Sequence, residues 1–382
     1  WIAGQVAMGP GSFALTDANA EISGQPVAGE VRIESGARQH ITVRLEGDDI
    51  DSAVFFPEQA EHVSKVWRHV LGLSPAEHDE VSEKSERARP GTTVEISARR
   101  LQHAGSVYKD VDAQIVIDAN ALLVPKASLT TEAGAHLGAS GRIVRASSDS
   151  GSAKGTMNYE IDAADGRAIA QAGKLLGLEE ILARQMTVLP SMRIGGLVQI
   201  GRRQPGAAEV TFDGIIGGAR IVGDGSFDNG FSAWRTAPAR IVASVRAGDL
   251  GEMLKLAGAG PQLLAGLTPR PGEASLAISG TLANGAKSMA EVSAEGLSAT
   301  LRGTIWTQDN QAIAYQADGD VDAQDAREAL VLAGLVAPAG LSRVSLAGPV
   351  TVSAKDGVTT LSSRGLKSFS SVIKGSVRLT HA

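Results

Sequence analysis

The sequence predicts a mainly β protein in which groups of strands are separated by short helices. Apolar and polar residues alternate with a period of two along many segments, and glycine is abundant at 45 residues. Aromatic residues make up only 4% although hydrophobic residues reach 43%, so the apolar content is mostly aliphatic. Such a composition suits thin β-layers better than one thick aromatic core. We expect elongated, curved antiparallel sheets that form a groove-like β-structure, with helices between the strand groups.

The alternation places apolar side chains on one face of each predicted strand. In residues 41–46, Ile41, Val43 and Leu45 alternate with polar residues, and later segments repeat the pattern. Pairs such as Asp213-Gly214, Asp224-Gly225 and Asn284-Gly285 predict turns between the runs. The apolar positions that we expect to line the groove are Ile41, Val43, Leu45, Val111, Ile115, Ile117, Ile241, Val245, Leu276, Ile278, Leu346 and Val350.

Four short helical patterns interrupt the strands, at residues 58–71, 165–178, 250–257 and 322–332. Each follows a strand that runs into an aspartate, and each ends at a Leu-Gly or Ala-Gly pair, which indicates an internal repeat. Asp322 is expected to cap the fourth helix, and Asp325 to favour its first turn. The repeat predicts units at 1–73, 91–182, 183–258 and 259–335, a polar linker at 74–90 and C-terminal strands at 336–382.

The sequence lacks the patterns that are typical of several classes of function. The net charge is −6 without a basic cluster, which argues against nucleic acid as a partner, and the absence of cysteine removes thiolate chemistry. The seven histidines lack metal-ligand spacing, and no nucleophile motif is present. The alternating aspartates of 318–325 resemble a calcium loop but lack its glycine and distal glutamate. We therefore predict no catalytic residue, cofactor or metal ion.

The predicted apolar strand faces have few bulky residues to fill them. The chain has only 4 Trp, 3 Tyr and 7 Phe. An open trough lined by aliphatic side chains would suit acyl chains. The alternative is an ordinary closed core made of small residues, which the composition also allows.

Two segments carry a resemblance to a known family. "SFALTDANAEISGQPVAGEVRI" (residues 12–33) and "DVDAQIVIDANALLVPKASLTTEAGAHLGASGRI" (residues 110–143) resemble the AsmA family, and "LSATLRGTIW" (residues 297–306) looks like the same unit. The shared texture is a strand, a hairpin and two spaced glycines. AsmA-like proteins are Gram-negative envelope proteins with an N-terminal inner-membrane helix and a periplasmic, groove-like β-structure. They are linked to outer-membrane homeostasis and phospholipid movement.

The resemblance implies a non-enzymatic, periplasmic region that handles phospholipid or other membrane lipids. Because the chain begins at Trp1 within an apparent strand, we expect it to be part of a longer polypeptide. The inner-membrane tether would then lie in a segment absent from this chain. Other envelope proteins are further candidate partners. The alternative function is a structural or interaction scaffold of the cell envelope with closed cores and no lipid.

Overall fold

The structure is a computed structural model of the 382-residue chain. It describes residues 2–22, 25–36, 39–51, 91–103, 106–118, 121–145, 153–175, 190–256, 264, 267–308, 313–332, 344–356 and 358–380. The chain divides into two compact units. The first contains Trp1–Leu178, Gly195–Ala208 and Gly230–Ser232, and the second contains Glu179–Ile194, Glu209–Asn229 and Ala233–Ala382.

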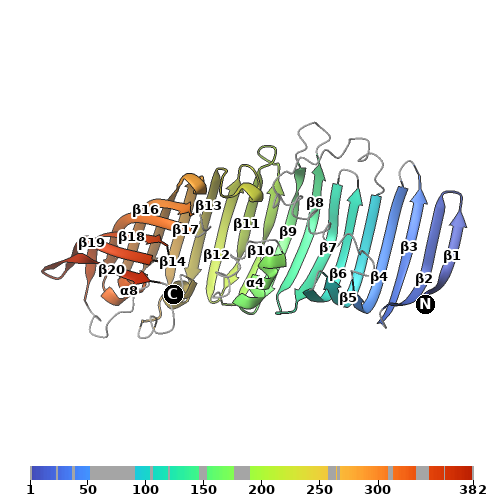
Figure 1. The fold of residues 1–382 in the computed structure, drawn as a ribbon. Coiled ribbons are helices and arrows are strands. Elements are labelled where there is room, and N and C mark those ends of the chain that lie inside the picture. Colours follow the sequence, from blue (N-terminus) through green and yellow to red (C-terminus); the bar gives the residue numbers. More distant parts are fainter. Residues whose placement is uncertain are drawn as a thin grey trace. The chain divides into compact units, whose positions relative to one another are not determined.

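The first unit is built from strands that pair in sequence order (Figure 1). Its elements are β1 (Ile2–Gly9), β2 (Ser12–Ile22), β3 (Gln25–Ser35), β4 (Gln39–Asp51), β5 (Gly91–His103), β6 (Ser106–Asp118), β7 (Ala121–Thr131), β8 (His136–Arg145), β9 (Ala153–Ala163), α4 (Gly166–Leu175) and most of β10 (Met192–Ile200). Among the described residues of this sheet, buried clusters lie around Leu45 and Val111 and around Val124 and Ile143.

The pair β4–β5 differs from the predicted antiparallel arrangement. These strands run parallel, from His40 opposite Gly91 to Asp51 opposite Gln102. Parallel neighbours need a crossover of a dozen or more residues, and residues 52–90 separate them in the sequence. Side chains alternate between faces in both kinds of ladder, so the period-two pattern does not distinguish them. The helix predicted at 58–71 and the linker at 74–90 lie outside the described residues.

The second unit holds the remaining strands and two of the α-helices. Its elements are β11 (Ala208–Ile216), β12 (Ala219–Phe227), η1 (Phe231–Ala233), β13 (Ala239–Ala247), α6 (Leu250–Leu256), β14 (Gly272–Gly280), η2 (Leu282–Asn284), β15 (Ala286–Ala294), β16 (Leu297–Thr307), β17 (Ile313–Ala323), α8 (Ala326–Leu332), β18 (Leu346–Lys355), β19 (Val358–Ser368) and β20 (Ser371–Thr380). From β12 to β20, each strand pairs antiparallel with the next.

The prediction of a mainly β fold with open, curved sheets and short helices between strand groups is confirmed. The finer division into four repeat units, a linker and C-terminal strands stays a prediction. Within the described ranges, no helix is long and apolar enough to cross a membrane.

Two predicted turn pairs lie inside strands. Asp213-Gly214 is in β11 and Asp224-Gly225 is in β12. A Cβ at Gly214 would come within 2.6 Å of the Ile194 Cα, so close approach of the backbones explains this glycine. Asn284-Gly285 does lie at a junction, between η2 and β15, and Gly285 has a φ of 92°. Turn chemistry alone therefore does not identify which Asx-Gly pairs end a strand.

Candidate functional site

The groove-lining candidates of the first unit share one face of its sheet. Residues directly opposite each other on paired strands project to the same side. Val43 of β4 is opposite Val94 of β5, which is opposite Ile115 of β6. The neighbouring rows are Ile41–Thr92–Ile117 and Leu45–Ile96–Ala113, and Val111 continues the face along β6. The structure thus brings together all six candidates from this part of the sequence.

The six candidates of the second unit also share one face. Ile241 is opposite Ile278, and Val245 is four residues further along the same strand, on the same face. Leu276 begins a row that crosses five strands, from β14 to β18. The row is Leu276–Ala290–Leu301–Gly319–Val350, and the row beside the helices is Gly272–Ala294–Leu297–Ala323–Leu346. We call this surface the apolar face of the second unit.

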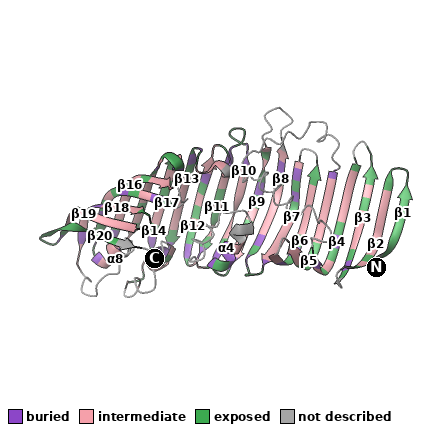
Figure 2. Cartoon of the chain, in the orientation of Figure 1, coloured by how far each residue is buried: buried purple, intermediate pink, exposed green. Residues whose placement is uncertain are grey.

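The apolar faces are only partly covered (Figure 2). Leu45, Val111, Leu346 and Val350 are buried, at 5–9% exposure. Six candidates are half-buried: Ile41, Val43, Ile115, Ile241, Val245 and Ile278. Ile117 is 42% exposed and Leu276 is 39% exposed. In a sandwich, a second sheet would cover such positions, so the first face is open at Ile117, near the end of β6, and the second at Leu276, in the middle of β14.

The opposite face of each sheet is polar and carries cross-strand ion pairs. Arg44 lies 2.6 Å from Glu95 in the first unit, and Arg246 lies 2.9 Å from Glu273 in the second. The hydrogen bond from Arg220 lowers the pKa of the Asp213 carboxyl in the second unit. These exposed pairs contribute little to stability, but they identify the solvated side of the sheets. Each unit is therefore amphipathic across its sheet.

Three strand-to-helix junctions repeat the same cap. Asp165 accepts backbone N–H bonds from Arg167 at 2.9 Å and Ala168 at 3.0 Å. At the other two junctions the cap accepts from the residue two positions on: Asp249 from Gly251 at 2.9 Å, and Asp325 from Arg327 at 3.0 Å. The expected roles of the two aspartates at the last junction were wrong, because Asp322 is an exposed residue of β17. The helices begin at Gly166, Leu250 and Ala326, each one residue after its cap.

An alanine lies two residues before each cap and leaves room for the helix to pack on the end of the strand. Ala163, Ala247 and Ala323 are all buried, at 1%, 7% and 0% exposure. A small side chain there lets the following helix pack closely on the strand end. An Ala-x-Asp pattern in the sequence would have identified Asp325 as the cap.

Helices α6 and α8 close one end of the apolar face of the second unit. Leu250, Met253 and Leu254 of α6 pack with Leu297 and Ala323 in a buried cluster. The ion pair between Arg270 and Glu328 ties α8 to the segment before β14, with 2.5 Å between Nη2 and Oε2. This end of the face is therefore a packed core rather than an open surface.

The aspartates of 318–325 do not converge on a site. Asp318 and Asp320 are exposed on the polar face of β17, and Asp318 accepts a hydrogen bond from the Thr351 hydroxyl at 2.6 Å. Asp325 is held by Arg327, whose hydrogen bonds lower the pKa of its carboxyl. In the part of the chain that the structure describes, no group of three or more His, Asp or Glu side chains is placed to hold a metal ion.

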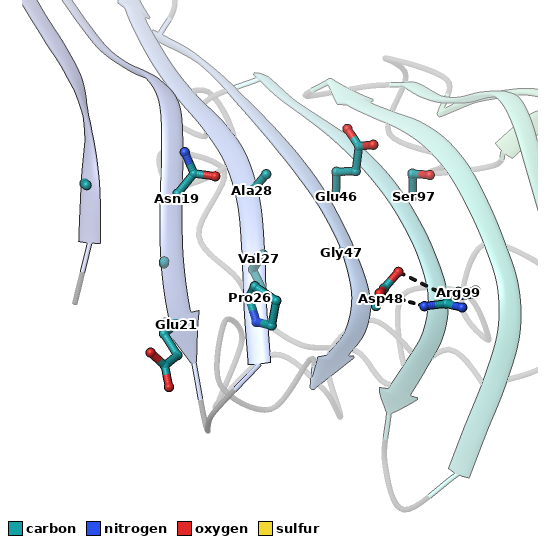
Figure 3. A pocket seen from close by; sticks show the side chains of 12 residues that line it. Asn19, Glu21, Pro26, Val27, Ala28, Glu46, Gly47, Asp48, Ser97 and Arg99 are labelled. Atoms are coloured by element: carbon teal, nitrogen blue, oxygen red, sulfur yellow. Dashed lines mark hydrogen bonds and ion pairs between the residues drawn. The ribbon is translucent and has the colours of Figure 1, made fainter.

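A shallow depression of about 860 Å³ lies on the polar face of β1 to β5 (Figure 3). Asn19 of β2, Glu46 of β4 and Ser97 of β5 line it, and Arg99 forms an ion pair with Asp48 at 2.6 Å. Both partners of this pair are about 70% exposed. Exposed groups of mixed sign do not select one ligand chemistry, so the apolar faces are the stronger candidate site.

Sequence reasoning missed several members of the apolar faces. Val94 and Ile96 of β5 and Leu301 of β16 lie in the same rows as the predicted residues. The alternation of apolar and polar residues in segments 92–98 and 297–305 would have predicted their place on the apolar face. Two tyrosines that the sequence did not single out are partly buried: burial raises the pKa of the phenols of Tyr159 and Tyr315.

No family model, curated protein or solved structure matches the chain. The resemblance to the AsmA family therefore stays a prediction from the sequence.

Proposed function

We propose that the chain is a non-enzymatic, lipid-handling region of an AsmA-like envelope protein, and that its apolar sheet faces hold phospholipid acyl chains. In this proposal the region lies in the periplasm and contributes to outer-membrane homeostasis. Its tether to the inner membrane belongs to a segment outside this chain. No cofactor or metal ion takes part.

One observation carries the proposal: the row from Leu276 to Val350 is continuous, apolar and open at Leu276. Four strand spacings of about 4.8 Å make this row about 19 Å wide. Each methylene group that leaves water to lie against it gains about 0.8 kcal/mol. A lipid headgroup would remain in water, because the faces offer aliphatic contact rather than polar partners.

The test compares two substitutions at neighbouring positions of β14. Leu276→Asp puts a carboxylate on the apolar face, whereas Ala277→Asp puts one on the opposite, polar face of the same strand. The variants are purified from a membrane-containing host and examined by native mass spectrometry with lipid extraction. Burying a carboxylate against acyl chains costs several kcal/mol, so we expect Leu276→Asp to lose at least about tenfold in retained phospholipid. Ala277→Asp should retain it.

A folded wild-type protein without lipid would favour the scaffold function instead. The packed end of the apolar face of the second unit, at α6 and α8, is the feature that suits it. Equal retention by the two variants would contradict the location of the lipid, and thermal unfolding of both variants separates lipid loss from loss of fold.

A further inference from the structure

The β19–β20 hairpin differs in charge from the rest of the protein. Residues 357–382 contain Arg364, Lys367, Lys374 and Arg378 but neither Asp nor Glu. The whole chain has 42 acidic against 36 basic residues, so the remaining sequence carries all of the negative excess. The four cations are exposed, and among the described residues no carboxylate forms an ion pair with them. A single-sign surface of this kind attracts a partner of opposite charge.

The hairpin is also amphipathic. Leu366 is opposite Ile373 on the side that continues the apolar face, whereas Lys367 is opposite Val372 on the other side. Ile373 is 47% exposed and Val372 is 59% exposed. Cations therefore stand beside exposed aliphatic side chains near the tip.

Phe369 at the tip is unusual in two independent ways. Ser368 pairs with Ser371, so Phe369 is the first residue of a two-residue loop, and its φ is 51°. Hairpin loops usually have glycine where the first residue needs a positive φ. The other described non-glycine residues with positive φ are all aspartates, which tolerate this conformation. Phe369 is also 77% exposed, so neither backbone preference nor packing in this chain explains an aromatic residue here.

We propose that the tip of the β19–β20 hairpin docks on the surface of an anionic phospholipid bilayer. Phe369 would enter the interface between headgroups and acyl chains, where an aromatic ring is favoured, and Lys367 would remain at headgroup level. The four cations would add attraction to anionic lipids. A protein strand added to the edge of β20 would use backbone hydrogen bonds and would not require an aromatic turn. The charge and the tip together therefore favour a bilayer.

The experiment is flotation of the full chain with vesicles of phosphatidylcholine alone and of phosphatidylcholine mixed with phosphatidylglycerol. We expect the wild type to bind the anionic vesicles preferentially and to be released by high salt. Phe369→Gly should weaken binding by about tenfold or more, and Lys367→Gln by about fivefold. The control Lys287→Gln removes an exposed cation from β15, outside the hairpin, and should leave binding close to wild type.

Thermal stability gives a second readout for Phe369→Gly, because glycine adopts a positive φ without backbone strain. The variant should melt at the same temperature as the wild type or higher while it loses vesicle binding. Unchanged flotation of Phe369→Gly, equal binding to neutral vesicles, or assembly of copies along β20 without vesicle binding would each overturn the proposal. It does not depend on lipid held by the apolar faces: Leu276→Asp should still float, and Phe369→Gly should still retain extracted phospholipid.

Discussion

The ion pair between Arg270 and Glu328 allows a sharp test of how α8 is held. The Glu328 side chain is 3% exposed and that of Arg270 is 17% exposed. The substitution Glu328→Gln keeps the size of the side chain but removes its charge. The Arg270 Nε is already buried without a hydrogen-bond partner, so the loss would leave the guanidinium still less satisfied.

Removal of one partner from a fully buried ion pair costs about 3–5 kcal/mol, and the partial exposure of Arg270 reduces this to about 2–3 kcal/mol. The matched control is Glu252→Gln in α6. Glu252 pairs with Lys255 at 2.6 Å, but the side chains are 30% and 47% exposed. The control should cost about 0.5 kcal/mol or less.

Urea unfolding followed by tryptophan fluorescence measures both variants, since Trp234 and Trp306 lie in the second unit. We expect a lower midpoint for Glu328→Gln with an unchanged slope. Substitution of Arg270 and Glu328 together by methionine should restore most of the loss, because no charge then remains unpaired. Equal, small effects of Glu328→Gln and the control would refute the claim that this ion pair holds α8 in place.

Two further predictions concern the apolar face and its helix caps. Gly319→Ala should destabilise the second unit by about 2–3 kcal/mol, because the new methyl group would overlap the Thr300 carbonyl oxygen. The control is Gly138→Ala, whose methyl group would lie 3.6 Å from its nearest neighbour. It should change the free energy of unfolding in urea by less than about 1 kcal/mol. Similar losses in the Gly319 and Gly138 variants would contradict this explanation. Folding lowers the pKa of the Asp325 carboxyl, so its negative charge stabilises the folded protein fully above the unfolded pKa of about 3.9. This stabilisation is lost as the pH falls through the lower pKa of the folded state. Urea midpoints across this acid range should fall less for Asp325→Asn than for the wild type, and parallel profiles would argue against a role for its charge.

Much of the candidate site could be predicted from period-two alternation. Because side chains alternate strictly along a strand, the apolar residues of β4, β6, β13, β14 and β18 had to share a face within each strand. The ladders then join these short faces into rows, such as Val43–Val94–Ile115. Members in less regular runs, such as Ala290 and Gly319, belong to the face only through register.

The helix junctions show where local pattern was ambiguous. Asp322 and Asp325 both precede an apolar run, and either could cap a helix by composition alone. Pairing of Asp322 with Ser298 on β16 extends β17 to Ala323 and leaves Asp325 as the cap. The burial of Glu328 was equally hidden, since Arg270 reaches it from 58 residues away in the sequence.

The sequence by itself determined the β class, the sidedness of the strands and the approximate places of the three described α-helices, α4, α6 and α8. These are local properties, set by the two-residue side-chain period and by capping chemistry. Only the tertiary structure decided that β4 and β5 run parallel, that glycines 214 and 225 lie inside strands, and that Leu276 is open while Leu346 is buried. Strand direction, close backbone approach and coverage all depend on which distant segments become neighbours, and an alternating pattern is compatible with many such arrangements.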